Sequence, residues 1–357
     1  MTARINGVRI AGIAAVTPRN VVNNDQLAQF SEDERIKLIN TTGITRRRVI
    51  EGEVCTSDLC FEAANDVLAA TGVSPEDVGI LIFVTQTPDY VLPATSIVLA
   101  NRLGLSSGCA AFDVNLGCSG YTYGLWQAGA LLPSTGARYA LLLVGDTISR
   151  IVSDEDKSAL ALFGDAGTAT LIEASGEAPS DWIFDLGSDG AGAKNLIVEA
   201  GGFRKRPTVD NLERQVGRDG NRRSGVELFM DGPQVLNFTL REIPKSVKKT
   251  VGDAGWSIDE VDAFVFHQAN KIMLDYLAKR AGVPATAMGF SIGEYGNTSS
   301  ATIPLTLAYA FSDRLAEGTM KLLLSGFGVG WSWASCALQV GPIPRPTLRE
   351  VEFEAHG

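Results

Sequence analysis

The sequence predicts an α/β protein built from two copies of one unit, and three observations support this. Short β-rich runs alternate with helical patterns along the whole chain, which is typical of a covered sheet. Segments of the second half resemble segments of the first half in the same order. The 357 residues are 45% hydrophobic, which is enough apolar material for a large core.

The first half contains three strand-like runs. Residues 78–86, 109–116 and 139–146 are short, β-rich and apolar on both faces. Helical patterns lie between such runs along the chain, as in Ser57–Gly72, where apolar residues recur at helical spacing and a glycine ends the pattern. We therefore expect strands in the middle of a sheet that helices cover.

Three pairs of segments indicate an internal duplication. The run SPEDVGILIFV at Ser74 resembles SIDEVDAFVF at Ser257, and the runs FDVNLG and ALLLVGD resemble FSIGEYG and KLLLSGFG. Each pair is separated by about 180 residues. Any two α/β segments look somewhat alike, but the shared order favours duplication. We expect halves at 1–175 and 231–357, joined by a connecting segment at 176–230.

Composition excludes several classes of function. The net charge of −10 argues against nucleic acid or an anionic membrane as the main partner. The five cysteines are odd in number and form no C-x-x-C pair, which disfavours a disulfide framework or a structural zinc site and favours a reducing cytosol. The N-terminal apolar stretch is interpreted as a strand rather than a signal peptide. No apolar run reaches the roughly 20 residues of a membrane helix.

A long polar segment, Gly201–Gly225, separates the two halves. It is rich in glycine and arginine and shows no periodic pattern. A loop of this length in a compact chain is often a lid or a binding loop. Its arginines would suit a phosphate, and they would equally suit an ordinary solvated surface.

Cys118 is the first candidate for chemistry. It lies in FDVNLGCSG, where a buried strand turns into a helix of small residues. The positive end of a helix favours the thiolate and is expected to lower the thiol pKa. Such a cysteine can attack an acyl group and hold it as a thioester. The alternative is an inert buried cysteine, which is common.

Two residues of the second half join this candidate. His267 ends the strand VDAFVF, and the chain's other histidine, His356, lies in the tail. Carboxyl ends of strands are where α/β sheets place their chemistry. Asn297 lies on the glycine-rich turn that matches the Cys118 turn in the first half. If the duplication holds, the two turns face each other with His267 nearby, although a core histidine and a turn asparagine would look the same in isolation.

The run SGFGVGWSWAS is interpreted as a glycine turn between two strands. It lacks the spacing of a dinucleotide-binding motif. A bare backbone N–H at such a turn can approach a reacting carbonyl. We expect Gly330 and the N–H of Cys118 to form an oxyanion hole.

The chain resembles the β-ketoacyl-acyl carrier protein synthase III family of thiolase-like condensing enzymes. The resemblance spans nearly the whole chain and includes TTGITRRRV, FDVNLGCSG, FGDAGTAT, HQAN, YGNTSSATIP and GFGVGW. It implies a duplicated, five-layered αβαβα fold, a homodimer, and a catalytic set of Cys118, His267 and Asn297. It also implies an acyl pocket that includes Phe163.

The reaction implied is a decarboxylating Claisen condensation. Cys118 takes an acyl primer from CoA or from an acyl carrier protein, and malonyl-acyl carrier protein then enters. Neutral His267 and Asn297 donate hydrogen bonds to the thioester oxygen while CO2 leaves, and the enolate attacks the acyl-cysteine. Loss of CO2 generates the carbanion, so the resemblance implies neither a metal nor a redox cofactor.

Two departures from the family pattern concern the primer. Family members that use acyl-CoA typically carry a Trp and an Arg that hold the adenine, and Lys37 and Thr41 stand at those positions. Losing both should weaken CoA binding, which favours a primer on a carrier protein. Leu92 stands where a larger residue, often Phe, reaches into the partner's acyl pocket, so a longer or branched primer would fit.

An acidic carrier protein needs a local basic surface on this acidic chain. We expect Lys271, Lys279 and Arg280 to supply it, with Arg46–Arg48 as a second cluster. The family's usual basic residue on this helix is replaced by Ile272. Ordinary solvated charge is an equally simple interpretation.

Three other functions deserve comparison. An acyltransferase of specialised metabolism would move the acyl group without decarboxylation, but it would not need the His–Asn pair. A non-catalytic, carrier-binding subunit would not need the cysteine. A cysteine hydrolase would use His267 as a base on water and would give Asn297 no clear role.

Overall fold

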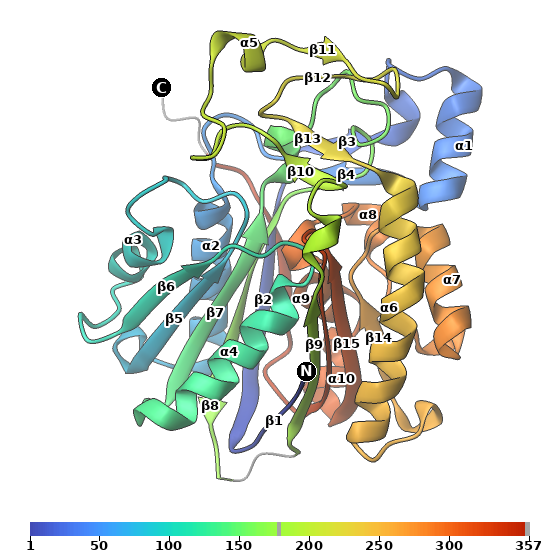
Figure 1. Cartoon of the computed structure of the whole chain (residues 1–357). Helices are drawn as coiled ribbons and strands as arrows, with labels where there is room; N and C mark the ends of the chain where they lie inside the picture. Colours follow the sequence, from blue (N-terminus) through green and yellow to red (C-terminus); the bar gives the residue numbers. More distant parts are fainter. Residues whose placement is uncertain (177–179, 354–357) are drawn as a thin grey trace.

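The structure is a computed structural model that describes residues 1–176 and 180–353 (Figure 1). Two sheets lie side by side. The first has six strands in the order β17-β2-β8-β7-β5-β6, and the second has five in the order β1-β9-β16-β15-β14. The first sheet is formed by β2 (Val8–Pro18), β5 (Val78–Val84), β6 (Ala110–Val114), β7 (Tyr139–Asp146), β8 (Ala166–Ala174) and β17 (Thr347–Val351). The second is formed by β1 (Thr2–Ile5), β9 (Trp182–Ser188), β14 (Ala263–Phe266), β15 (Met320–Gly328) and β16 (Ser332–Val340).

The two sheets repeat one arrangement, which confirms the predicted duplication. The order β2-β8-β7-β5 in the first sheet returns as β9-β16-β15-β14 in the second. Strand directions within these four-strand orders also match, because β5 and β7 pair in parallel as β14 and β15 do, whereas the other two pairs in each order are antiparallel. In the first sheet, β6 pairs in parallel with β5. At the corresponding place in the second sheet, beside β14, there is only a single parallel bridge between Phe264 and Met288.

Helices form three layers around and between the sheets. The middle layer holds α4 (Gly120–Thr135) and α9 (Thr302–Ala310), whose apolar side chains share one core with both sheets. Outside the first sheet lie α2 (Thr56–Thr71) and α3 (Thr95–Arg102), and outside the second lie α6 (Gly232–Asp253) and α7 (Lys271–Ala281) (Figure 1). The predicted five-layered αβαβα fold is therefore confirmed.

Small residues explain how α4 fits between two sheets. An added Cβ at Gly124 would lie 2.6 Å from a methyl group of Leu142 on β7, which is closer than van der Waals contact allows. A larger side chain at this position would push the helix away from the sheet. The glycine-rich sequence after Cys118 therefore places the start of α4 deep in the molecule.

The remaining helices and strands are mostly short and lie outside the two sheets. The remaining helices are α1 (Glu32–Thr42), α5 (Val209–Leu212), α8 (Ile292–Tyr295) and α10 (Ser312–Glu317). Three two-stranded ribbons are formed by β3 (Val21–Asn23) with β4 (Arg46–Arg48), β10 (Leu196–Val198) with β13 (Leu228–Met230), and β11 (Gln215–Val216) with β12 (Arg222–Arg223). Single 3-10 turns lie at Asn24–Gln26, Pro75–Asp77, Ile148–Ile151, Gly190–Gly192, Ile258–Glu260, Ala285–Ala287 and Ser299–Ala301.

The sheets do not follow the predicted division of the chain into halves at 1–175 and 231–357. β9 lies in the predicted connecting segment, 176–230, yet it belongs to the second sheet. β1, from the N-terminal region, also joins the second sheet, and β17 returns to the first. As limits of domains, these boundaries stay a prediction.

Membrane-spanning helices and metal-binding clusters are both absent from the described residues. No helix in 1–176 or 180–353 combines the length and the apolar character needed to cross a bilayer. The same residues contain no cluster of three or more histidine, cysteine or acidic side chains arranged to hold a metal ion. His356 lies outside the described residues.

Candidate active site

Three connecting turns supply the predicted site residues. Cys118 lies between β6 and α4, His267 follows β14 directly, and Asn297 lies between α8 and α9. Because α4 and α9 occupy equivalent places in the two halves, the turns before them meet in the centre of the molecule. All three side chains are buried, with exposed fractions of 8%, 2% and 6% respectively.

Cys118 is held against the end of β15. A Cβ added to Gly328 would lie 2.8 Å from the Cys118 sulfur, so only glycine leaves room for the thiol there. The neighbouring Ser119 caps α4, which begins at Gly120, and its hydroxyl lies 2.6 Å from that of Ser332 on β16. The cysteine therefore precedes the helix by two residues rather than forming its first residue.

Burial reverses the predicted shift of the Cys118 pKa. The sequence-based expectation was a lowered pKa, whereas burial and the negative charge of Asp146 raise it to about 12. Hydrogen-bonding interactions with the Val329 backbone and the Ser299 side chain act in the opposite direction but are outweighed. In the resting protein, the thiol is therefore protonated at neutral pH.

His267 is neutral, as predicted. Burial lowers its pKa to about 3, so the imidazole carries no charge at pH 7. Its Nδ1 lies 2.9 Å from Oγ1 of Thr302, and its ring contacts Phe327 edge-on. The backbone N–H of His267 donates to Ser325 of β15, which fixes the start of the turn.

Asn297 is positioned by its own backbone. Its N–H donates to the carbonyl of Leu162 at 2.9 Å, and its carbonyl accepts from the N–H of Gly164 at 3.1 Å. The side-chain oxygen accepts a hydrogen bond from the N–H of Ser299, also at 2.9 Å. Among the described residues, no partner engages the side-chain NH2 group, which leaves it available to a ligand.

Ser299 connects all three residues, and sequence reasoning did not identify it. It lines one cavity with Cys118, its N–H donates to Asn297 at 2.9 Å, and the hydroxyl of Thr302 joins its carbonyl to Nδ1 of His267, at 3.0 and 2.9 Å. It also has a φ of 51°, a left-handed conformation that is uncommon outside glycine. The signal was present in the run GNTSS, but serine is so common in turns that its role required the tertiary structure.

A cavity of about 360 Å³ opens onto Cys118. Its walls are largely apolar and come from both halves of the fold. They are formed by Gln86, Asn115, Cys118, Ile148, Ile151, Phe163, Ala193, Leu196, Ile197, Val198, Leu228, Ser299, Val329 and Gly330. The volume and the apolar lining are typical of a site for a small organic group. The structure thus places Phe163 and Gly330 beside Cys118 in one cavity.

The backbone near Gly330 differs in detail from the expectation. As predicted, the GFGVGW run is a turn between two paired strands, β15 and β16. The N–H that interacts with the Cys118 sulfur belongs to Val329, one residue earlier. Gly330 itself lines the cavity, so its role toward a carbonyl oxygen stays a prediction.

Leu92 does not line the Cys118 cavity of its own chain. Its exposed fraction is 78%, and the adjacent Tyr90 and Val91 are exposed by 60% and 77%. The family-based expectation that Leu92 enters a partner's pocket stays a prediction. Lys37 and Thr41, the other two departures from the family pattern, lie exposed on α1.

The expected basic surface is only partly free. Lys271 pairs with Asp275 at 2.6 Å, and Arg280 donates to the carbonyl of Leu240 at 3.1 Å. Lys279 forms no ion pair with any residue in 1–176 or 180–353. Two exposed apolar side chains, Ile272 and Tyr276, lie on the same helix, α7.

The prediction that Arg46–Arg48 form a second basic cluster on the surface is wrong. Arg47 and Arg48 are only 4% and 7% exposed. Arg47 donates to the carbonyl of Phe163 at 2.9 Å, and Arg48 pairs with Glu350 at 2.6 Å. Consecutive arginines in a strand point to opposite faces, and here both faces are covered by tertiary contacts. Their charges stabilise the fold beside the cavity instead.

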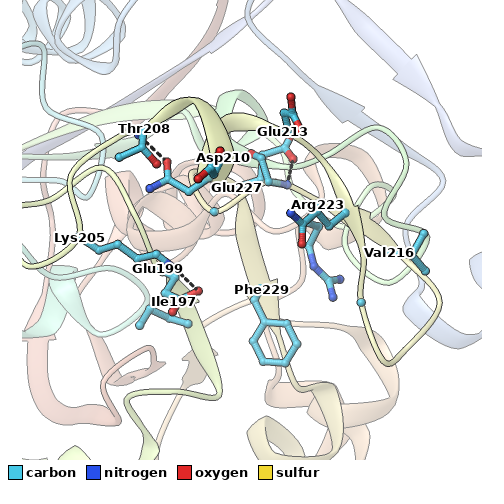
Figure 2. Close-up of a pocket in the computed structure, with 15 residues that line it drawn as sticks. Ile197, Glu199, Lys205, Thr208, Asp210, Glu213, Val216, Arg223, Glu227 and Phe229 are labelled. Atoms are coloured by element: carbon cyan, nitrogen blue, oxygen red, sulfur yellow. Dashed lines mark hydrogen bonds and ion pairs between the residues drawn. The ribbon is translucent and has the colours of Figure 1, made fainter.

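The polar segment Gly201–Gly225 is more regular than predicted. It contains α5, β11 and β12, and its arginines at 214, 222 and 223 form ion pairs with neighbouring acids. Figure 2 shows a second cavity here, of about 520 Å³, in which Lys205 pairs with Glu199 at 3.1 Å. Neither cysteine nor histidine lines it.

Comparisons with known proteins place this geometry in a family. Residues 112–198 match the family model for 3-oxoacyl-[acyl-carrier-protein (ACP)] synthase III, and residues 251–340 match the model for its C-terminal part. A beta-ketoacyl-[acyl-carrier-protein] synthase III of Rhodopirellula baltica is 35% identical over 350 residues, covering 93% of this chain and 98% of the relative. One from Neisseria meningitidis serogroup A is 32% identical over 331 residues, with 93% and 98% covered.

Solved structures agree with the fold. A 3-oxoacyl-(acyl-carrier protein) synthase from Burkholderia xenovorans is 44% identical with a TM-score of 0.92, covering 98% of this chain and 99% of that one. A 3-oxoacyl-(acyl carrier protein) synthase III from Pseudomonas aeruginosa is 31% identical with a TM-score of 0.80, and 95% and 99% are covered. With these likenesses over nearly its whole length, the chain belongs to the β-ketoacyl-acyl carrier protein synthase III family.

Proposed function

We propose that the protein condenses a cysteine-bound acyl primer with malonyl-acyl carrier protein, losing CO2, to give a 3-oxoacyl-acyl carrier protein. The family supports this reaction. One geometric observation carries the assignment of residues: a thiol, a side-chain amide and an imidazole meet at Ser299. This serine lines the cavity with Cys118, donates its N–H to Asn297, and is joined to His267 through the hydroxyl of Thr302. Each of these groups has a separate task in such a condensation.

The first half-reaction uses Cys118. Its sulfur attacks the primer thioester, and the acyl chain then occupies the apolar cavity beside Phe163. The N–H groups of Cys118 and Gly330 are the proposed donors to the oxyanion. The strands before and after the Gly330 turn, β15 and β16, pair with each other, so the backbone of this turn is held in place before substrate arrives.

The second half-reaction uses His267 and Asn297. As the malonyl group loses CO2, negative charge develops on the thioester oxygen, and the two side chains donate hydrogen bonds to it. The unengaged NH2 group of Asn297 suits this task, and so does an imidazole that stays neutral. The enolate carbon attacks the acyl-cysteine carbonyl, and the sulfur of Cys118 leaves as thiolate.

This role restricts the tautomer of His267. The hydroxyl of Thr302 lies 2.9 Å from Nδ1 and 3.0 Å from the carbonyl of Ser299, and its single proton can serve only one of them. For Nε2 to carry the proton that meets the substrate, Thr302 must donate to Nδ1. The proposed role of His267 thus requires that Thr302 donate to Nδ1 rather than to the carbonyl of Ser299.

Finer features of the protein form part of the same proposal. A homodimer is supported by the edge position of β6 in the first sheet and by the exposed run Tyr90, Val91 and Leu92. Carrier-protein docking on α7, through Lys271, Lys279 and Arg280, is supported by their exposed positions on one helix. All five cysteines are free, which supports a cytosolic location.

The primer is proposed to arrive on a carrier protein. The argument is the absence of the Trp–Arg adenine clamp at Lys37 and Thr41, both of which are exposed on α1. Neither a lysine nor a threonine can stack on adenine as the missing pair does. Equal rates of Cys118 acylation from acetyl-CoA and from acyl carrier protein thioesters would contradict this part.

One experiment tests the reaction in two stages. Intact-mass spectrometry measures acylation of Cys118 by a panel of primers, and CO2 release from malonyl-acyl carrier protein then measures condensation. Cys118→Ala should abolish the mass shift, whereas Asn297→Ala should still be acylated but release CO2 at least 100-fold more slowly. Acylation of the wild-type protein without CO2 release would instead support the non-decarboxylating acyltransferase, which no observation favours at present.

A further inference from the structure

Two carboxamide side chains interrupt the apolar wall of the Cys118 cavity. Apart from Cys118 and Ser299, the polar side chains that line this cavity are Gln86 and Asn115. Within residues 1–176 and 180–353, no hydrogen bond reaches either carboxamide. Each carboxamide has an NH2 group that donates and an oxygen that accepts. The reaction described above gives neither of them a partner, so their position calls for an explanation.

Both carboxamides come from the same edge of the first sheet. β5 ends at Val84 and β6 ends at Val114, and these two residues are partners in a parallel pair. Gln86 and Asn115 follow within two residues, so both leave the sheet at its carboxyl edge. In α/β proteins, ligands bind outside the carboxyl ends of parallel strands. The two side chains therefore occupy a place where contact with a ligand is expected.

Gln86 is held at the reactive end of the cavity. Its backbone N–H donates to Oδ1 of Asp146 at 2.6 Å. A Cβ added to Gly117 would overlap Oε1 of Gln86 and lie 2.7 Å from its Cδ, so the carboxamide occupies the space that this glycine leaves. Gly117 directly precedes Cys118. The carboxamide therefore lies beside the turn that carries the nucleophile, rather than at the far end of the cavity.

Water can satisfy both carboxamides before the primer arrives, because Gln86 is half-buried and Asn115 is exposed in the single chain. An acyl chain that enters the cavity displaces such water. A hydrocarbon cannot replace the lost hydrogen bonds, so it leaves the carboxamides unpaired, which weakens binding. A hydroxyl on the chain can accept a hydrogen bond from an NH2 group and donate one to a carboxamide oxygen.

We propose that Gln86, together with Asn115, selects a primer whose acyl chain carries a hydroxyl group on C3. The inference rests on the proposed function, because it names the class of primer that the same site loads. Gln86 lies one residue from the Cys118 turn and is not an oxyanion donor, so it meets a substituent a short way along the chain. C3 is the position to which the proposal commits.

The hydroxyl takes no part in the bond changes of loading. The sulfur of Cys118 forms a bond to the acyl carbonyl carbon, and the bond from that carbon to the carrier sulfur breaks. The thiol proton of Cys118 leaves with the carrier thiol. The two carboxamides thus act on binding and selection, and the chemistry of acyl transfer stays the same for every primer.

A branched hydrocarbon primer is the competing class, because the apolar walls, such as Ile148 and Leu228, suit it as well. Two acyl groups of nearly equal shape separate the alternatives. 3-Hydroxybutyryl carries a hydroxyl on C3, and 3-methylbutyryl carries a methyl group at the same place. A site that hydrogen-bonds a hydroxyl rejects the analogue that lacks it, whereas a merely apolar pocket hardly distinguishes the two.

The test measures single-turnover acylation of the full-length protein by intact mass, with both primers on the same acyl carrier protein. Each enantiomer of 3-hydroxybutyryl is tried, and the faster one is compared with 3-methylbutyryl. Gln86→Met and Asn115→Leu each remove a carboxamide at nearly constant volume. The control, Gln127→Met, makes the first change on α4, outside the cavity, at a side-chain oxygen that also lacks a partner in the described residues. The readout is the ratio of the two rates within one protein, so a misfolded fraction cancels.

We expect wild type and Gln127→Met to load 3-hydroxybutyryl faster than 3-methylbutyryl by about 10-fold or more. Gln86→Met should lower this ratio by about 10-fold, and Asn115→Leu by about 3-fold, because Asn115 is the more exposed of the two. An unchanged ratio in either variant, or a wild type that prefers 3-methylbutyryl, would overturn the proposal. Selective loading without CO2 release from malonyl-acyl carrier protein would instead refute the proposed function and leave this inference standing.

Discussion

At the scale of single residues, Thr302 has a greater effect than its position suggests. It lies at the start of α9, outside the Cys118 cavity, and contacts only one nitrogen of His267. In the proposed mechanism, Thr302 must donate to that nitrogen so that the other nitrogen of His267 carries the proton that meets the substrate. A hydroxyl that touches no substrate would then affect how well decarboxylation is stabilised.

Replacing Thr302 should separate the two half-reactions. We expect Thr302→Val to lower CO2 release by about 10-fold, because Nδ1 loses the donor that favours the proton on Nε2. Acylation of Cys118 should stay within about 2-fold. Stopped CO2 assays on the pre-acylated enzyme measure the first rate and intact mass the second. Thr302→Ser keeps the hydroxyl and should restore activity; equal CO2 release in all three proteins would contradict the tautomer argument.

The buried imidazole also predicts a pH dependence of stability. The pKa of His267 falls from its ordinary 6.5 to about 3 on folding, so between these values the unfolded chain binds the extra proton. Stability from this group is complete above pH 6.5 and is lost as pH falls, by about 1.4 kcal/mol per pH unit. Asp165 acts oppositely, because its pKa rises to about 6 on folding.

The difference between two proteins isolates the histidine. Urea unfolding of wild type and His267→Asn from pH 6 to pH 4 should give free energies that converge as pH falls, because the variant lacks the proton-linked loss. The contribution of Asp165 is present in both and cancels. Parallel curves over this range would show that His267 is not held neutral by burial.

Residue types were easier to predict than their ionisation. Cys118, His267 and Asn297 stand out because each lies in a distinctive motif at a predicted turn. Cys118 and His267 do follow strands, whereas Asn297 lies between two helices, α8 and α9. The direction of the Cys118 pKa shift was predicted wrongly, since it depends on Gly328 closing over the sulfur and on Asp146 arriving from another strand. Such desolvation is a property of tertiary contacts and leaves no pattern in the sequence.

At the scale of elements, the glycine-rich end of β15 packs closely against the turn that carries Cys118. An added Cβ at Gly326 would lie 2.7 Å from the carbonyl oxygen of Cys118 and 2.9 Å from the Cα of Ser119. These are backbone atoms, which cannot move aside as a flexible side chain can. The contact thus couples a strand of the second half to the nucleophile of the first.

Widening that contact should impair both folding and loading. We expect Gly326→Ala to lower the free energy of unfolding by about 1–3 kcal/mol and to slow acylation of Cys118 at least 10-fold. Urea unfolding and intact-mass kinetics measure the two effects. Gly190→Ala is the matched control, since nothing lies within 4 Å of its added Cβ. A fully stable and active Gly326→Ala would show that the strand end yields easily.

The strand pattern was well predicted except at residues 109–116, where β6 lies at the edge of its sheet rather than in the middle. Residues 78–84 and 139–146 form strands as their two-sided apolar character indicates, and their partners about 180 residues later form the same sheet positions. The prediction that Arg46–Arg48 form a surface patch was wrong because of how neighbouring elements pack around this strand. A short strand of arginines looks solvated in sequence, and only the packing of α8 and Glu350 around it buries two of the three.

At the scale of the whole molecule, the exposed run Tyr90, Val91 and Leu92 indicates a missing contact. These three side chains are 60–78% exposed, in the connection between β5 and α3, and β6 forms an open edge of the first sheet. Long apolar exposure near an open sheet edge favours association with another copy. We therefore place the proposed homodimer contact there rather than over the second sheet.

A charge in this run should weaken the dimer. We expect Leu92→Asp to raise the dimer dissociation constant at least 10-fold, because the carboxylate would lose its hydration in the interface. Sedimentation velocity over a dilution series measures it. Val209→Asp on α5, where the side chain is 76% exposed, is the control and should leave association unchanged. Identical sedimentation of the Leu92 and Val209 variants would move the contact elsewhere.

The crossing of the chain between the sheets has a consequence for biosynthesis. β1 completes the second sheet, and β17 returns from the other end of the chain to flank β2 in the first. An emerging nascent chain therefore cannot finish its first sheet until residues 347–351 have left the ribosome. The turn that carries Cys118 is therefore synthesised long before the last strand of its own sheet.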